Sequence, residues 1–177
     1  MPQQPPRILL EGRPGSGKTT VVRRLVELLE RDRVPVFGIL TDDVRKSGRR
    51  VGFAVERLDG PREMLAHVSF AGPPRVGRYG VDLGALERVA LPALAEGGGG
   101  STAIVDELGK MELASDAFRA AVLDLLGRPV SIVATAQLAE HPFVRELKGQ
   151  YAFAVERVMA TTRDELPARL AARLSRD

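Results

Sequence analysis

Residues 12–19 read Gly12-Arg-Pro-Gly-Ser-Gly-Lys-Thr19, and this stretch decides the fold. It fits the pattern GxxxxGK[ST], whose glycines let the backbone curl so that successive amide groups face one anion. The apolar run Arg7-Ile-Leu-Leu-Glu11 precedes it, and apolar residues recur every three or four positions from Val21 to Leu29. In a strand, loop and helix of this order, the unpaired amides of the helix start bind phosphate. The stretch therefore predicts a phosphate-binding loop.

The polar residues of this loop have distinct predicted roles. Lys18 reaches the β- and γ-phosphates, Thr19 offers its hydroxyl to Mg²⁺, and Thr20 supports the first helical turn. Arginine greatly outnumbers lysine in this chain, so a lysine at the position that needs a compact point charge supports the assignment. A glycine-rich turn that matches by accident is the alternative. The predicted nucleotide-binding residues here are Gly12, Arg13, Pro14, Gly15, Ser16, Gly17, Lys18, Thr19 and Thr20.

An apolar strand pattern that ends in two acids, Thr102-Ala-Ile-Val-Asp-Glu107, is the expected partner of the loop. We expect Asp106 to lie beside Thr19 at the carboxyl edge of the sheet and to hold the magnesium ion with it. Glu107 is the candidate base that orients or deprotonates the attacking water, a role that needs a carboxylate near the terminal phosphate but off the metal. A pair of acids that only caps a turn is the structural alternative.

The remaining sequence alternates strand and helix patterns, which predicts an α/β fold with three layers and a mostly parallel sheet. Beyond the first strand, helix and loop, strands are expected at 34–41, 51–58, 102–105, 130–135 and 151–155, and helices from a cap at Asp82 to before Gly97 and at 115–126, 140–148 and 164–174. The strands at 34–41 and 51–58 form a β-hairpin extension that 63–69 can lengthen, and 71–80 is expected to be a loop. The glycines at 97–100 are interpreted as a surface loop, so residues 1–177 are expected to form a single domain.

Composition narrows the function classes. Hydrophobic residues make up 44% and charged residues 28% of the 177, as in globular proteins. The absence of cysteine excludes disulfides, thiolate zinc sites and a cysteine nucleophile, and His67 and His141 are too far apart for a histidine cluster. The net charge of +3 comes without a basic block, so nucleic acid is an unexpected partner. No apolar stretch is long enough to span a bilayer, and we expect a cytoplasmic monomer.

Five segments of the chain resemble those of one known family. Asp106-Glu-Leu-Gly-Lys-Met-Glu-Leu113 resembles the DEIGKMEL signature of the cancer-related nucleoside-triphosphatases. Four further segments resemble that family's GFxTEEVR, RxGF, VGxYGV and HPxV stretches; they lie at 38–45, 50–53, 76–81 and 141–144. One departure is Asp43, which stands where the family has the second glutamate of TEEVR.

The resemblance implies a RecA-like P-loop domain that hydrolyses ATP, GTP, CTP and UTP slowly to diphosphate and phosphate, with Mg²⁺ and broad base tolerance. It also implies a second nucleotide-binding segment, which consists of Asp106, Glu107, Leu108, Gly109 and Lys110.

Several weaker candidates surround this core of the site. Fast hydrolysis usually needs a further cation at the γ-phosphate, and Lys110 is favoured over Arg45 and Arg50, for which a solvated hairpin is an equal alternative. Thr41 and Asp43 could bind water or magnesium from the side opposite Glu107, or simply end a strand. His141 is interpreted as a helix cap, His67 is expected on a strand face, and Tyr79 is a weak candidate for stacking on a nucleobase.

Two other functions share the phosphate loop. A nucleotide or small-molecule kinase would exclude water and close an arginine-rich lid, and no such segment is evident. A nucleotide-gated binding module that reads guanine normally carries an NKxD-like strand end, whereas Thr135-Ala-Gln-Leu138 lacks both the lysine and the aspartate. The sequence therefore favours a hydrolase that uses several bases.

Overall fold

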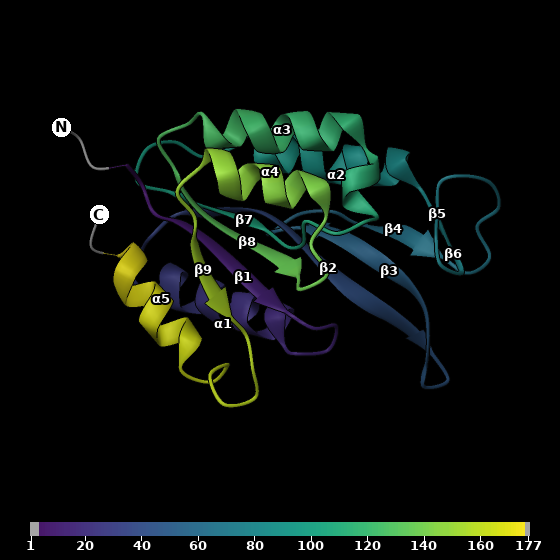
Figure 1. Ribbon diagram of the computed structural model, residues 1–177, viewed down its shortest axis with the longest axis horizontal. Coiled ribbons are helices and arrows are strands. Elements are labelled where there is room, and N and C mark those ends of the chain that lie inside the picture. Colours follow the sequence, from purple (N-terminus) through teal and green to yellow (C-terminus); the bar gives the residue numbers. More distant parts are fainter. Residues whose placement is uncertain (1–3, 176–177) are drawn as a thin grey trace.

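The computed structural model describes residues 4–175 and shows a sheet between two layers of helices (Figure 1). Within that range the sheet has nine strands in the order β5-β6-β4-β3-β2-β7-β8-β1-β9. The strands are β1 (Arg7–Gly12), β2 (Val36–Lys46), β3 (Arg49–Arg57), β4 (Arg62–His67), β5 (Arg75–Val76), β6 (Tyr79–Val81), β7 (Thr102–Val105), β8 (Ser131–Gln137) and β9 (Ala154–Arg157). The α-helices are α1 (Lys18–Arg31), α2 (Leu83–Leu94), α3 (Asp116–Leu126), α4 (Pro142–Gln150) and α5 (Leu166–Leu174).

Five neighbouring strands of the sheet, β2-β7-β8-β1-β9, are all parallel. Their carboxyl ends therefore meet at one edge of the sheet, where the phosphate loop follows β1 and the acidic pair follows β7. β8 lies between these two strands, so the loop strand and the acid strand are not neighbours. The expected three-layer α/β fold with a RecA-like arrangement is confirmed.

Strand alternation divides the apolar side chains between the two faces of the sheet. Ile8 and Leu10 of β1 pack in the cluster that contains the apolar stripes of α1 and α5. Leu9, between them, points to the opposite face and joins the larger cluster under α2, α3 and α4. Figure 1 shows these two helix groups on opposite sides of the sheet. The alternation explains why the apolar residues Ile8, Leu9 and Leu10 are buried although they point to both faces of the sheet.

The other half of the sheet is antiparallel, and it is larger than the predicted hairpin. β2, β3 and β4 pair in sequence, and β4 pairs with β6. The expectation of an irregular loop at 71–80 is wrong, because β5 and β6 form a small hairpin there across Gly77. Gly77 has a φ of 56°, which a glycine adopts without strain, and the turn lets Tyr79 and Val81 bury their side chains.

A second correction concerns the last strand, which was expected at 151–155. Tyr151 instead ends α4, since its amide donates to the Leu147 carbonyl, and Phe153 packs under that helix. Pairing with β1 begins only at Ala154 and continues to Arg157. Apolar residues alone could not distinguish a helix-closing segment from a strand.

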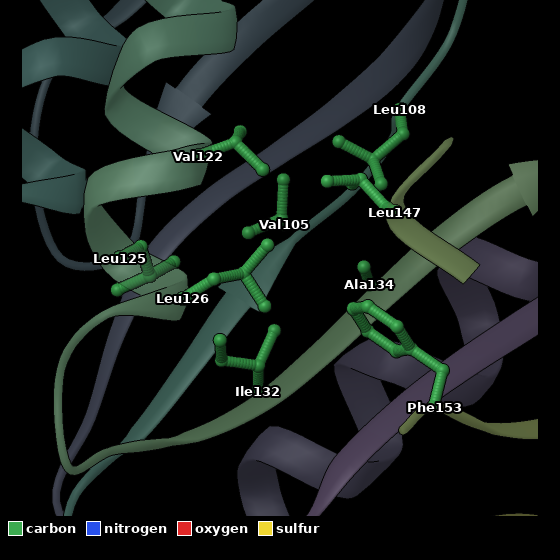
Figure 2. A pocket seen from close by; sticks show the side chains of 9 residues that line it. All are labelled: Val105, Leu108, Val122, Leu125, Leu126, Ile132, Ala134, Leu147 and Phe153. Atoms are coloured by element: carbon green, nitrogen blue, oxygen red, sulfur yellow. The ribbon is translucent and has the colours of Figure 1, made fainter. Parts of the chain in front are cut away.

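The helices that surround the sheet are short. In residues 4–175, none combines the length and the hydropathy that crossing a bilayer requires. Under α3 and α4 lies a void of about 10 Å³, lined by nine apolar side chains that include Val122, Leu126 and Phe153 (Figure 2). A void of this size without polar groups is a packing defect of the core and not a ligand site.

Candidate nucleotide site

The phosphate loop closes around its own backbone. Gly15 and Gly17 have φ values of 76° and 98°, in the left-handed region that favours glycine. Gly12 is required for space, because a Cβ there would lie 2.4 Å from Ser16 Oγ. Gly17 is the N-cap of α1, and its carbonyl accepts from the Val21 amide at 2.9 Å. The first amides of α1 therefore lie directly after the curled loop, as a phosphate cradle requires.

Lys18 is folded across this loop. Its side chain is 7% exposed, and its Nζ donates to the carbonyls of Gly12 at 2.9 Å and Arg13 at 3.3 Å. The ammonium thus sits at the centre of the cradle, where it would meet an entering phosphate. Ser16 Oγ is buried and has no hydrogen-bond partner within residues 4–175. A buried hydroxyl without a partner in such a loop fits an anion that would accept from it.

Asp106 is the buried acid of the site. Thr19 Oγ1 donates to its Oδ2 at 2.8 Å, Thr135 Oγ1 donates to its Oδ1 at 2.6 Å, and the Thr41 amide also donates to the carboxylate. Burial raises the pKa of Asp106 to about 6, against the opposing effect of these hydrogen bonds. The predicted pairing of Thr19 with Asp106 is present, although β8 separates their strands.

Glu107 lies close to the lysine of the phosphate loop. Its Oε2 lies 3.9 Å from Lys18 Nζ, and its Oε1 accepts from Gln137 Nε2 at 3.2 Å. Glu107 therefore faces the lysine that would carry the terminal phosphates, whereas the hydrogen bonds of Thr19 go to Asp106. The roles of Glu107 as the water-activating carboxylate and of Asp106 as the metal-binding one stay predictions.

A third carboxyl group, that of Glu112, is buried near Glu107. Glu112 is 4% exposed, and the amides of Gly109 and Glu112 donate to its carboxyl group. Burial, followed by the charge of Glu107, raises the pKa of Glu112 well above its ordinary range, which favours its protonated form. A Cβ on Gly109 would lie 2.8 Å from both Glu107 Oε1 and Glu112 Oε2. A larger residue at position 109 would therefore force one or both carboxyl groups to shift. Leu108 before it is buried in the core.

The donor set of the site suits magnesium. Mg²⁺ prefers oxygen ligands and is usually held by one or two carboxylates, substrate phosphates and water. The Thr19 hydroxyl and the Asp106 carboxylate are oxygen donors within hydrogen-bond distance of each other. No group of three or more His, Asp or Glu side chains in the described part of the chain forms a metal cage. Phosphate and water would supply the remaining ligands of an ion bound here.

The structure does not bring all the predicted accessory residues to the phosphate loop. Arg45 bonds Asp43 and the Gly48 carbonyl, and Arg50 bonds Asp43 and the Tyr79 hydroxyl. These contacts hold the side chains on the hairpin of β2 and β3, which projects beyond the rest of the sheet (Figure 1).

Lys110 follows Glu107 by three residues and is exposed, with no ion pair among residues 4–175. Its positive charge lies near His141, whose pKa is lowered by burial, by Arg119 and by Lys110. A role for Lys110 at the γ-phosphate stays a prediction.

The aromatic and histidine candidates have structural positions. Tyr79 is 7% exposed and packs edge-on against Phe53, so its ring is not free to stack on a base as was considered. His141 is the N-cap of α4, where its Nδ1 accepts from the Phe143 amide at 3.1 Å, as expected. His67 ends β4 and bonds Ser69.

Sequence reasoning missed the polar groups that β8 contributes. Thr135 and Gln137 were considered only for guanine recognition, yet they contact Asp106 and Glu107. The available signal was their position, two polar residues on one face at the end of an apolar strand. The ion pair of Lys148 Nζ with the buried Glu11, at 2.8 Å, was also missed. It joins α4 to the end of β1, directly before the phosphate loop.

Comparisons with known proteins agree with this geometry. A family model described as NTPase matches residues 7–171. The human cancer-related nucleoside-triphosphatase is 43% identical over 136 residues, which cover 71% of this chain and 72% of that protein. The nucleoside-triphosphatase THEP1 of Thermotoga petrophila is 38% identical over 162 residues, 90% of this chain and 88% of that protein. A solution structure of a human cancer-related nucleoside triphosphatase superposes with a TM-score of 0.82 at 36% identity, over 96% of this chain and 97% of that one.

Proposed function

We propose that this chain, which belongs to the NTPase family, is an enzyme that hydrolyses nucleoside triphosphates to diphosphate and phosphate with Mg²⁺ and with little choice of base. Hydrolysis is the activity that the names of its relatives carry. The observation that supports it most strongly is that two adjacent carboxylates contact different residues of the phosphate loop. Glu107 lies 3.9 Å from Lys18, while Asp106 bonds Thr19.

The proposed reaction uses these groups in separate roles. The loop amides and Lys18 hold the β- and γ-phosphates and offset their negative charge. Glu107 accepts a proton from the attacking water while the oxygen of that water forms a bond to the γ-phosphorus. At the same time the bond from the γ-phosphorus to the β,γ-bridging oxygen breaks. The bridging oxygen leaves with the diphosphate. Gln137 orients Glu107 through the hydrogen bond to its Oε1.

Magnesium would be held by Thr19 and Asp106, and when bound it would neutralise phosphate charge during transfer. Thr135 and the Thr41 amide keep Asp106 in position by donating to its carboxylate. P-loop proteins that bind guanine specifically normally carry an NKxD-like strand end. Thr135-Ala-Gln-Leu138 lacks both the lysine and the aspartate of that motif, which supports broad base tolerance.

The test is phosphate release from ATP, GTP, CTP and UTP in parallel, with Mg²⁺ and with a chelator. We expect release from all four that depends on the metal. Glu107→Gln should lower kcat about 10²- to 10⁴-fold, the range that general-base groups contribute, and should leave nucleotide affinity nearly unchanged. Lys18→Met should lower both kcat and affinity, because it removes the charge at the centre of the cradle.

Glu30→Gln is the matched control, since Glu30 is an exposed carboxylate at the far end of α1. Its rates should equal those of the native chain. If nucleotide binds but no triphosphate is hydrolysed, the hydrolase assignment fails. If an added acceptor alcohol is converted to its phosphate ester while no free phosphate is released, the result would support the kinase alternative.

A further inference from the structure

A hollow lies beside the phosphate loop, on the side away from the acidic pair. Its volume is about 520 Å³, within the roughly 300–1,000 Å³ typical of small-molecule sites. The loop and α1 form one wall, and the segment that leads into α5 forms the other. The lining residues are Gly17, Thr20, Val21, Arg24, Arg163, Asp164 and Pro167.

The second wall is fixed to the end of β1. The Val158 amide donates to the Glu11 carbonyl at 2.8 Å, directly after β9 leaves the sheet. The Arg163 amide then donates to the Met159 carbonyl at 2.9 Å, in a turn that Thr162 Oγ1 also closes by bonding the Arg157 carbonyl. These bonds place the Arg163 side chain against the phosphate loop. A Cβ on Gly17 would lie 3.4 Å from Arg163 Cδ.

The strand order says which end of a bound nucleotide would face this hollow. β8 lies on one side of β1 and β9 on the other. Glu107 and Asp106 follow β7 on the β8 side, so the γ-phosphate must point that way for hydrolysis. The other end of a triphosphate that lies along the loop then points toward β9 and α5. We infer that the hollow takes the nucleoside, its base and its ribose, and that the Arg163 guanidinium lies against the base. This inference rests on the proposed function.

The residues that line the hollow fit a site that binds a nucleobase without distinguishing one base from another. Among the lining residues that the structure describes there is no aromatic ring and no side-chain amide. The apolar residues of the lining are Val21 and Pro167, which are largely buried. The main contact for a base is therefore the exposed arginine, because the planar guanidinium of an arginine stacks on the face of any base. The nearest acid to the Arg163 guanidinium is Asp164, whose Oδ1 is 4.0 Å away, and the Arg163 side chain is 48% exposed. Its guanidinium is thus available to a ligand.

The test compares a ligand that has a nucleoside with one that does not. Dissociation constants of ADP, CDP and inorganic pyrophosphate, each with Mg²⁺, are measured by calorimetry for the native chain and for Arg163→Ala. We expect Arg163→Ala to weaken ADP and CDP about five- to tenfold and pyrophosphate less than about twofold, as befits one stacking contact. Arg163→Lys should lose nearly as much ADP affinity as the alanine variant, because it keeps the charge without the plane.

Arg173→Ala is the matched control, since Arg173 is an exposed arginine in the last turn of α5 that does not line the hollow. Equal losses for ADP and pyrophosphate in Arg163→Ala would overturn the inference, because the residue would then act on phosphate. Unchanged ADP affinity would also overturn it, provided that thermal melting shows the variant folded. The readout is binding, so a chain that binds ADP through Arg163 but hydrolyses no triphosphate would contradict the proposed function alone.

Discussion

The two halves of the sheet differ in what their charged side chains contact. In the parallel half, residues that are far apart in sequence meet at one edge, as when Thr19, Asp106 and Thr135 form one hydrogen-bonded group. In the antiparallel half, charges pair on adjacent strands, as Arg62 does with Glu56. Parallel strands end at the same edge, whereas antiparallel neighbours end at opposite edges. The comparison predicts that chemistry belongs to the parallel half.

The largest expected effect is that of Asp106→Asn, which removes a buried carboxylate of the parallel half. We expect kcat to fall at least about 10²-fold, because the proposed metal ligand is lost. The same change should stabilise the protein without metal. The pKa of Asp106 is raised to about 6 from its ordinary 3.8. The unfolded chain therefore releases this proton at lower pH than the folded one does, and stability is lost as the pH rises from about 4 to 6.

The size of that loss is at most about 3 kcal/mol. With a chelator present, the free energy of unfolding of Asp106→Asn should exceed that of the native chain by about 2–3 kcal/mol at pH 8, and the difference should be small at pH 3.5. Urea denaturation at both pH values measures it. A variant that is less stable at pH 8 would show that the carboxylate is a net stabilising group.

Lysines in the two halves give the next comparison. Lys110 lies shortly after the acids that follow β7, whereas Lys46 ends β2 on the hairpin, and both lysines are exposed. We expect Lys110→Ala to lower kcat about tenfold or more, as loss of a cation near the γ-phosphate would, and Lys46→Ala to leave it unchanged. Steady-state phosphate release decides between them. Equal rates for both variants would remove Lys110 from the mechanism.

Gln137 tests whether β8 positions the base. Gln137→Leu removes the donor to Glu107 Oε1. Because Gln137 is partly exposed, this hydrogen bond to a charged group is worth about 1.5 kcal/mol or less. We therefore expect kcat to fall about five- to tenfold. KM should hardly change. The control is Gln150→Leu, which removes a similar bond to Glu146 on the surface of α4. The same loss in a Glu107→Gln background would argue against action through Glu107.

The smallest effects are expected on the hairpin. Arg45→Ala and Arg50→Ala should change kcat less than about threefold, because an arginine that acts on the γ-phosphate is worth about 10³-fold or more and these two bond Asp43 instead. Phosphate release under saturating ATP measures this. A loss of 10²-fold or more in either variant would mean that the hairpin closes over the nucleotide, and it would break the comparison between the halves.

Much of the site could be predicted because its determinants are local. The phosphate loop depends on glycine φ values and on amides of adjacent residues, which a short motif specifies. Asp106 and Glu107 were identified from the apolar strand that precedes them. Thr135 and Gln137 were not, because their contacts depend on β8 lying between β1 and β7, and no local pattern states the order of strands. The hairpin of β5 and β6 was missed because its strands are too short to show a period.

The sequence by itself determined the phosphate loop, the alternation of strands and helices, and the identity of the two acids, since backbone torsions and burial periodicity are written residue by residue. Tertiary structure alone decided that Glu107 faces Lys18 and that Arg163 lies beside Gly17. Those facts depend on which strands are neighbours and how their ends align. Such contacts join residues far apart in the chain, and only packing of the complete sheet brings them together.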